Sequence, residues 1–140
     1  MRQILLFAAL AASLALLSGC ALSRAKEDKA EDMTGKAAYH KISAEEAYEM
    51  MASQEVVVVD VRTREEYDGG HIENAVLVPN ESIGSETPEA LPDKEATLLV
   101  YCRSGRRSKD AAEKLLALGY QSVYDFGGVI DWPYELVKEG

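Results

Sequence analysis

The sequence predicts an α/β fold in which helices flank a mainly parallel central sheet. Short apolar runs rich in valine and leucine alternate along the chain with segments of helical periodicity, and this alternation is typical of a parallel sheet. The run VVVVD at Val56–Asp60 is apolar up to its last residue, as in strands that are buried on both faces. With 47% hydrophobic and 28% charged residues among 140, the chain has the composition of an ordinary globular domain.

The first half of the domain contains two capping patterns and two strands. A capping box at Ser43–Glu46 predicts that a helix begins there and turns its apolar side inward. The strand Val56–Asp60 follows, and a second capping pattern at Thr63–Glu66 predicts a short helix that ends at Gly69-Gly70. Ala75–Pro79 (AVLVP) is the next predicted strand.

The second half repeats the alternation of strand and helix. Asn80–Asp93 contains two prolines and is expected to form a loop or a poorly ordered helix. Thr97–Tyr101 is a buried strand, and apolar residues at helical spacing predict a helix from Ser108 to Gly119. Ser122–Phe126 is the last strand, followed by a closing helix around Trp132–Lys138.

The N-terminal segment resembles the export signal of a bacterial lipoprotein. Ile4–Leu17 is apolar apart from one serine but shorter than the ~20 residues that span a bilayer, as in a secretory signal peptide. Leu17–Cys20 (LSGC) resembles a lipobox, in which the cysteine is lipidated. The resemblance implies a signal peptide over residues 1–19 and an extracytoplasmic protein anchored in the cell envelope through lipid on Cys20. Ala21 favours the outer membrane, facing the periplasm, over the inner one, and plain cleavage near Cys20 is the alternative.

Composition separates a tether from the domain. Residues 20–38 carry many charges of both signs, which predicts a flexible tether reaching roughly 20–25 Å, and residues 39–140 are expected to form the domain. The net charge of −9 argues against a nucleic-acid partner, which needs a basic surface. His40 and His71 are the only histidines and belong to no ligand cluster in the sequence, so we expect neither metal nor cofactor.

Basic residues crowd around Cys102 in this acidic chain. Three arginines and a lysine lie within seven residues of it, although a basic side chain at a helix N-terminus costs about 0.3–1 kcal/mol. They are Arg103, Arg106, Arg107 and Lys109. A tight turn from strand to helix directs backbone N–H groups inward and binds anions. Since this turn and the cations both favour a thiolate, we expect a nucleophilic cysteine rather than an inert buried one.

The predicted strands also bring Cys102 close to an acidic residue. Asp60 and Cys102 end two strands, and open α/β sheets bind ligands beyond the carboxyl ends of their strands. We therefore expect Asp60, Arg62 and the Cys102 turn along one edge of the sheet. Gly105 permits backbone angles in that turn that other residues resist.

The stretch Cys102–Ser108 (CRSGRRS) resembles the active-site loop of rhodanese-family sulfurtransferases. The segment VVDVRTREEYDGGHIENAVLVP, residues 58–79, and GGVIDW, residues 127–132, are similar to further marks of that family. The resemblance covers essentially all of residues 39–140. It departs from the family at Glu73-Asn74, where Pro-Gly is common, and at Asp131, where alanine is common.

This resemblance implies the rhodanese-like three-layer fold and a two-step sulfur transfer. Cys102 attacks the outer sulfur of a small anionic donor such as thiosulfate, and a cysteine persulfide forms. An acceptor then takes the sulfur. The acceptor is cyanide or a thiol, and in a living cell it can be a protein. The backbone amides of Arg103–Ser108 are expected to cradle the persulfide, which is a form of covalent catalysis.

The resemblance assigns a role to each residue of the loop. The residues expected to bind the substrate or the persulfide are Arg103, Ser104, Gly105, Arg106, Arg107 and Ser108. Within this set, Arg107 is expected to be the structural and electrostatic arginine, whereas Arg103 and Arg106 meet the donor at the rim. Ser108 is expected to cap the helix rather than to bond to the loop.

Four residues outside the loop are interpreted from the same resemblance. Asp60 and Arg62 match the family's Asp-x-Arg, either as an ion pair that braces the loop or as substrate contacts. His71 is expected to be structural rather than a general base, and Trp132 to lie in the core.

Other functions remain as alternatives. Phosphatases and arsenate reductases with a Cys-x5-Arg loop need an arginine at position 108, where this chain has Ser108. A persulfide carrier without turnover, or a binding module that serves a membrane or periplasmic partner, is the main alternative. A thiol–disulfide oxidoreductase is disfavoured because the chain has no Cys-x-x-Cys.

Overall fold

The computed structural model describes residues 37–139. The predicted signal peptide, Cys20 and nearly all of the predicted tether lie outside these residues. The α/β expectation is confirmed by a sheet of five strands, all parallel, in the order β1-β5-β4-β2-β3. The strands are β1 (Ala38–Lys41), β2 (Val57–Asp60), β3 (Val76–Leu77), β4 (Thr97–Cys102) and β5 (Ser122–Gly128).

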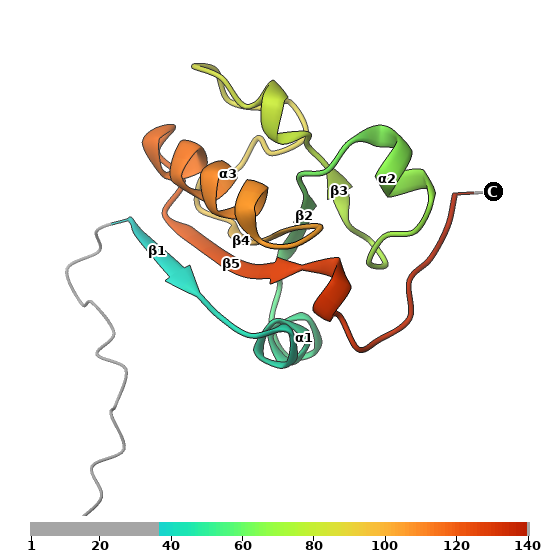
Figure 1. Ribbon diagram of the computed structural model, residues 1–140. Helices are drawn as coiled ribbons and strands as arrows, with labels where there is room; N and C mark the ends of the chain where they lie inside the picture. Colours follow the sequence, from blue (N-terminus) through green and yellow to red (C-terminus); the bar gives the residue numbers. More distant parts are fainter. Residues whose placement is uncertain (1–36, 140) are drawn as a thin grey trace, which may run out of the picture. The chain divides into compact units, whose positions relative to one another are not determined.

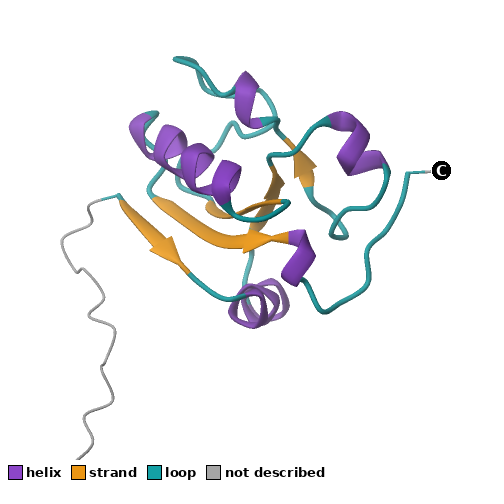
Figure 2. Ribbon diagram, viewed as in Figure 1, coloured by secondary structure: helices purple, strands orange, loops and turns teal. Residues whose placement is uncertain are grey.

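Helices cover both faces of this sheet and complete three layers (Figures 1 and 2). They are α1 (Ala44–Ser53), α2 (Arg64–Asp68) and α3 (Arg106–Ala117), with short 3₁₀ turns η1 (Asn80–Ser82) and η2 (Val129–Asp131). One apolar cluster joins α3 to the face of the sheet that includes Val100 and Cys102. The other joins α1 and α2 to the face that includes Leu99 and Tyr101. Neighbouring residues of β4 thus enter different cores, as the two-residue repeat of a strand requires.

Both predicted capping boxes are confirmed. The Ser43 hydroxyl accepts a hydrogen bond from the Glu46 N–H at 3.1 Å, and the Glu46 carboxylate accepts one from the Ser43 N–H at 2.7 Å. Thr63 and Glu66 form the same reciprocal pair before α2. Each box satisfies two of the backbone donors that a helix start leaves unpaired, so α1 and α2 begin at the positions that the sequence predicts.

Two expectations about the ends of the domain are corrected. Ala38, which the sequence places in the tether, begins β1, and this strand pairs with β5. The closing helix around Trp132–Lys138 is wrong, because this segment is extended and Val137 forms an antiparallel bridge with His71. Pro133 disfavours a helical conformation at the residue before it, and Trp132 accordingly has φ −77° and ψ 112°.

The remaining differences are small. The helix predicted from Ser108 begins two residues earlier, at Arg106. The segment 80–93 is a loop, as expected, apart from the single turn η1. Within residues 37–139, no helix is both long enough and apolar enough to span a membrane.

Candidate active site

Cys102 is the last residue of β4, at the edge where the strand passes into the turn before α3. It pairs in register with Gly128 of β5, after a register shift between Val100 and Cys102 that marks an irregularity in the ladder. Such irregularities bend a strand and redirect its side chains. The Cys102 side chain belongs to the cluster beneath α3 and is only 1% exposed.

The loop after Cys102 surrounds its sulfur with hydrogen-bond donors. The Gly105 N–H donates to Sγ at 3.0 Å, and Gly105 has φ 102°, a left-handed conformation that glycine adopts without strain. Burial alone raises the pKa of the Cys102 thiol, but hydrogen bonds from the Ser108, Gly105 and Ser104 backbone outweigh it. The net effect lowers the pKa of Cys102 below its ordinary value. The loop therefore favours a thiolate in a site with little access to water.

Gly128 explains why this loop packs closely against β5. A Cβ atom at this position would lie 2.1 Å from the Arg103 carbonyl oxygen and 2.6 Å from the Ser104 Cα. The Ile130 N–H donates to the same Arg103 carbonyl at 3.2 Å and fixes the loop from the other side of Gly128. Gly128, the second glycine of the Gly-Gly pair, thus provides the space into which the start of the loop fits.

Arg107 points to α2 and forms an ion pair there. Its two terminal nitrogens donate to the two carboxylate oxygens of Glu66, each at 2.8 Å, the two-pronged geometry that is strongest for arginine. The hydrogen bonds from Arg107 lower the pKa of Glu66 to about 2. Glu66 therefore caps α2 and also ties it to α3. The sequence analysis found only the first of these roles, because nothing local indicates the second.

The rim beside the loop carries two arginines that form no ion pair with another described residue. Arg103 and Arg106 are exposed, and neither forms a salt bridge with another residue of the range 37–139. A polar pocket of about 640 Å³ lies here, lined by Asn80, Glu81, Ser104, Arg106, Arg107 and Asp110. Asp110 is engaged by Lys114 at 2.8 Å. Arg106 is thus free to attract an anion to this pocket.

Ser108 does not cap α3, and that expectation is corrected. Gly105 occupies the N-cap position, whereas Ser108 lies in the first turn and is fully buried. Its hydroxyl donates to the Asp125 carboxylate at 2.7 Å and contacts the Gly105 carbonyl at 3.1 Å. Ser108 therefore connects the cysteine loop to the strand behind it.

Asp125 is a buried carboxylate that the sequence analysis missed. Besides Ser108, it accepts from the Tyr39 hydroxyl at 2.7 Å and from the Gly127 N–H at 2.9 Å, and Lys41 lies at 3.2 Å. These partners satisfy a charge that would otherwise be costly to bury. A single acidic residue in the apolar run Ser122–Phe126 was the available signal.

Asp60 and Arg62 form a buried ion pair away from the thiol. Arg62 donates to Asp60 at 2.6 and 3.0 Å and to the Gly70 carbonyl at 2.8 Å. The Tyr101 hydroxyl also donates to Asp60, at 2.7 Å, and accepts from the Ile72 N–H at 3.1 Å. Tyr101 and Cys102 point to opposite faces of β4. The pair is thus at the predicted edge, but it holds the segment after α2 rather than the cysteine loop.

His71 and Trp132 also lie on this second face. The His71 ring stacks on Tyr67 at 3.6 Å, and its Nδ1 lies 2.9 Å from the Tyr67 carbonyl oxygen. Trp132 is half-buried and packs against Phe126, with ring centroids 5.6 Å apart. Neither side chain belongs to the surroundings of Cys102.

Comparison with known families agrees with this geometry. The model of the rhodanese-like domain matches residues 43–133, which include every strand except β1 and the whole cysteine loop. The chain belongs to the rhodanese-like domain family. Its parallel five-stranded sheet between helices is the rhodanese fold.

Solved structures and curated relatives place this rhodanese-like domain among proteins of different activity. It is similar to an E. coli rhodanese solved with anions, with 35% identity and a TM-score of 0.56 over 61% of this chain and 100% of that one. It is also similar to a human single domain sulfurtransferase, with 26% identity and a TM-score of 0.59 over 66% and 93% of the two chains. A Yersinia pestis tRNA uridine(34) hydroxylase is 31% identical over 106 residues, which are 72% of this chain and 30% of the relative. The chain thus spans less than a third of the length of that relative.

Proposed function

We propose that this rhodanese-like protein is a sulfurtransferase that takes sulfur from thiosulfate, or from another small anionic donor, and holds it as a persulfide on Cys102. The observation that carries the proposal is the set of loop donors around the buried Sγ, which lower the pKa of the thiol. The outer sulfur of a persulfide lies about 2.05 Å beyond Sγ. Inward-facing amides of the same loop stabilise its negative charge, as in an oxyanion hole.

The chemistry proceeds by two displacements at sulfur. The Cys102 thiolate attacks the outer sulfur of thiosulfate, a bond forms between Sγ and that sulfur, and the S–S bond of the donor breaks. The electron pair of that bond leaves with sulfite. An acceptor such as cyanide then attacks the outer sulfur and forms thiocyanate, and Sγ leaves as a thiolate. The covalent intermediate divides one transfer into two easier steps.

The exposed arginines are proposed to capture the donor. Arg106 lines the pocket beside the loop, and Arg103 lies at the start of the same loop. Both charges are solvent-exposed, so salt at 0.1 M largely screens their attraction for an anion at distances beyond about 10 Å. Arg106→Ala is therefore expected to raise KM for thiosulfate several-fold at low salt with a smaller effect on kcat, and the difference should narrow as salt is added.

The deciding experiment measures the mass of the intact full chain before and after exposure to thiosulfate. We expect the mass to rise by one sulfur atom, located by peptide mapping at Cys102, and to return on addition of cyanide as thiocyanate appears. Cys102→Ser removes the nucleophile and should show neither change, while keeping its far-UV circular dichroism spectrum. Sulfur gain by Cys102→Ser at a residue other than Cys20, or thiocyanate formation by this variant at the rate of the wild type, would refute the mechanism.

The same experiment separates an enzyme from a carrier. A rhodanese-like carrier without turnover would stay unmodified in thiosulfate but would gain sulfur from polysulfide or from a persulfidated protein. Repeated turnover of thiosulfate and cyanide by the wild type supports the sulfurtransferase. If only a persulfidated protein loads Cys102, the sulfurtransferase proposal is wrong and the chain is a persulfide carrier.

The resemblance of Leu17–Cys20 to a lipobox supports a further part of the proposal, namely that the domain is anchored in the bacterial envelope by lipid on Cys20. Bacteria that produce the full chain in the presence of an alkyne-tagged fatty acid should label the wild type but not Cys20→Ser. Separation of inner from outer membranes on a density gradient then identifies the membrane. Equal labelling of both proteins would contradict the proposal.

A further inference from the structure

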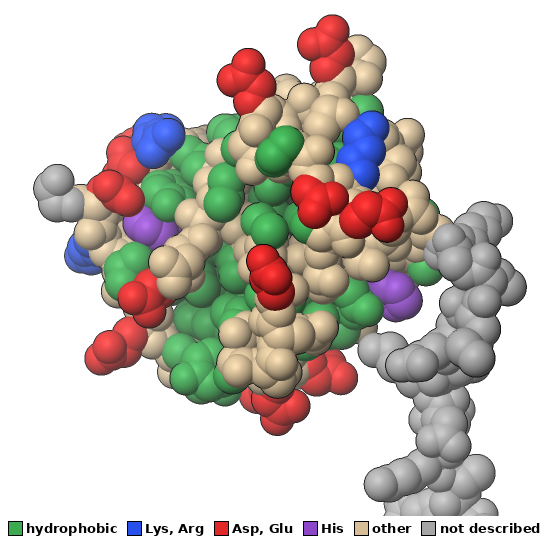
Figure 3. Space-filling model, turned by 180° about the vertical axis from the view of Figure 1, so that it is seen from behind, with side chains coloured by type: hydrophobic (Ala, Val, Ile, Leu, Met, Phe, Trp, Pro, Cys, Tyr) green, Lys and Arg blue, Asp and Glu red, His purple; other side chains and the backbone are tan. Residues whose placement is uncertain are grey.

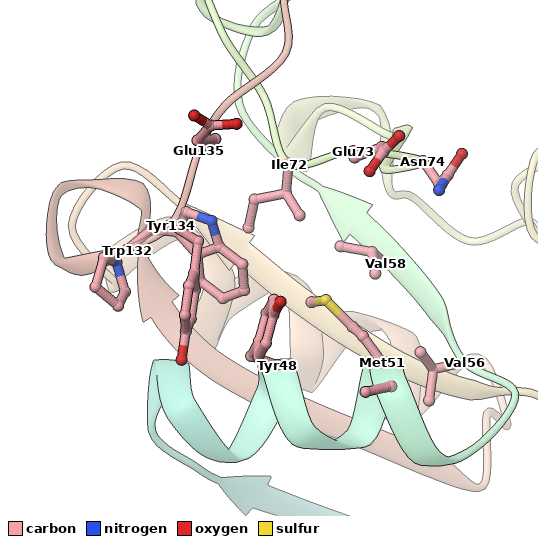
Figure 4. Close-up of a pocket in the computed structure, with 12 residues that line it drawn as sticks. Tyr48, Met51, Val56, Val58, Ile72, Glu73, Asn74, Trp132, Tyr134 and Glu135 are labelled. Carbon is pink, nitrogen blue, oxygen red and sulfur yellow. The ribbon is translucent and has the colours of Figure 1, made fainter.

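A second pocket lies on the face of the sheet opposite the thiol. It has a volume of about 750 Å³ and is formed by α1, β2, the turn before β3 and the segment after η2. We call it the α1 groove. Its apolar lining includes Tyr48, Met51, Val58, Ile72, Trp132 and Tyr134. Figure 4 shows Tyr48 and Met51 rising from α1 toward Ile72 and Val58. None of these residues contributes to the surroundings of Cys102.

Aromatic rings form one wall of the α1 groove. Tyr48 and Tyr134 stack at 3.9 Å, and Trp132 meets Tyr134 edge-on at 5.0 Å. The two tyrosines remain 46% and 37% exposed. Three rings held against one another present a fixed apolar surface, and the faces of such rings attract cations.

Carboxylates border the side of the α1 groove that lies away from α1. Figure 4 shows Glu73 and Glu135 across the groove from Tyr48 and Met51. Both carboxylates are exposed, and neither forms a salt bridge with any residue between positions 37 and 139. Figure 3 shows the rear face of the molecule, where acidic side chains surround exposed apolar ones and basic side chains are sparse. The border of the groove therefore has a negative charge that other described residues leave unbalanced.

The acidic border coincides with a departure from the family pattern. Glu73-Asn74 stands where Pro-Gly is common, and Asn74 has φ 63°. That conformation suits glycine best, although asparagine is among the side chains that tolerate it. The turn thus keeps the conformation expected of a glycine while it places an amide and a carboxylate beside the groove.

We propose that the α1 groove binds a lysine or arginine side chain presented by a basic, apolar segment of a partner protein. The apolar lining suits the aliphatic stem of such a side chain, and the carboxylates suit its charged head. Leu136 and Val137 remain 40% and 38% exposed just after the groove residues, so apolar neighbours of the bound cation also find a surface. This continuation along the chain favours a polypeptide over a free amine.

The site and the thiol are separate in the proposal. The α1 groove lies with the cluster of α1 and α2, whereas Cys102 lies with the cluster of α3. A partner bound in the groove leaves the cysteine loop accessible. The proposal consequently does not depend on whether Cys102 transfers sulfur.

Trp132 provides the measurement, because it is the single tryptophan of the chain and lines the groove. The full chain is titrated with an acetylated and amidated peptide, Ala-Leu-Lys-Leu-Ala, while tryptophan emission is recorded. The matched peptide has norleucine in place of lysine, which keeps the stem and removes the charge. We expect the lysine peptide to bind about fivefold or more tightly than the norleucine peptide, with an advantage that falls as salt rises.

Paired variants test the acidic border. Glu73→Gln with Glu135→Gln should abolish the preference for lysine, whereas Glu86→Gln with Glu89→Gln removes two exposed charges outside the groove and should leave it intact. Cys102→Ser should bind as the wild type does. Equal affinity for both peptides, or an unchanged preference in the Glu73 and Glu135 variant, overturns the proposal. So does the absence of any change in the emission and in the indole NMR signal of Trp132 at about 1 mM lysine peptide.

Discussion

Replacement of Gly128 by alanine is expected to displace the loop after Cys102, although Gly128 makes no hydrogen bond to the thiol. The new Cβ would lie 2.1 Å from the Arg103 carbonyl oxygen, and even a separation of 3.0 Å requires a movement of 3.0 − 2.1 = 0.9 Å. Gly128 has φ −125° and ψ 148°, an extended conformation that alanine also adopts. The expected effect is therefore purely steric, and overpacking of this kind costs about 1–3 kcal/mol of the free energy of unfolding.

The same movement should raise the pKa of the Cys102 thiol. Arg103 begins the loop whose Gly105 N–H donates to Sγ at 3.0 Å, and a hydrogen bond to a charged acceptor contributes about 1.5–3 kcal/mol. Loss of one such bond should therefore raise the pKa of Cys102, because the charged form of the thiol loses a donor that stabilises it. Burial, which already raises the pKa, would then be opposed by fewer donors.

Two assays on the full chain check this reasoning. Urea unfolding measures the loss of stability, and the pH dependence of iodoacetamide alkylation, followed by mass spectrometry of the peptide that contains Cys102, measures the pKa of the thiol. Gly84→Ala is the matched control, since its Cβ would meet nothing within 4 Å. If Gly128→Ala and Gly84→Ala have the same unfolding curve and the same alkylation profile, the loop is not held in the way that we describe.

Three further predictions use the same assays. Glu66→Gln should lower the free energy of unfolding by about 1 kcal/mol at pH 7. Because Arg107 lowers the pKa of Glu66 from 4.5 to about 2, the ion pair stabilises the fold fully above about pH 4.5 and progressively less as the pH falls toward 2. If Glu66→Gln loses stability in acid as the wild type does, this prediction is wrong. Tyr101→Phe should cost about 1–3 kcal/mol in urea unfolding because it removes the hydroxyl partner of a buried carboxylate and N–H, yet leave the alkylation profile of Cys102 in place; a shifted profile would mean that the two faces of β4 are coupled. Ser108→Ala removes the hydroxyl that connects the cysteine loop to Asp125 and should raise the alkylation pKa of Cys102, because the backbone donors of the loop are then held less firmly around Sγ. A profile like that of the wild type would show that the loop keeps its position without this hydroxyl.

The features that the sequence predicted well are those with local causes. Each capping box needs only four consecutive residues, so Ser43–Glu46 and Thr63–Glu66 identified two helix starts. The end of β4 and the turn after it were equally clear, because an apolar strand meets a glycine-containing basic stretch at Cys102. The topology then places Asp60 and Cys102 at one edge of the sheet without further information.

The features that it missed depend on contacts between distant segments. β1 consists of Ala38–Lys41 (AYHK), which contains no apolar run that would mark a strand in the sequence, and its pairing with β5 is what makes it a strand. The segment Trp132–Lys138 has apolar residues compatible with a helix, but its bridge to His71 extends it instead. The sequence around Ser108 is compatible with a helix cap, whereas its hydrogen bond of 2.7 Å to the Asp125 carboxylate joins residues from two separate elements and has no local signal.

The arrangement of charge around Cys102 shows how one loop can serve both as a rigid cradle and as an open binding site. Arg107 is neutralised by Glu66 and holds α2 against α3, so it contributes order more than free charge. Arg103 and Arg106 stay exposed and form no salt bridge with another residue of the range 37–139, so we propose that they attract the donor anion. The lowered pKa of the Cys102 thiol depends on buried backbone donors, which salt screens far less than exposed cations. In the proposed sulfurtransferase, capture of the donor and activation of the nucleophile therefore rest on different groups, and a change of ionic strength should alter the first without altering the second.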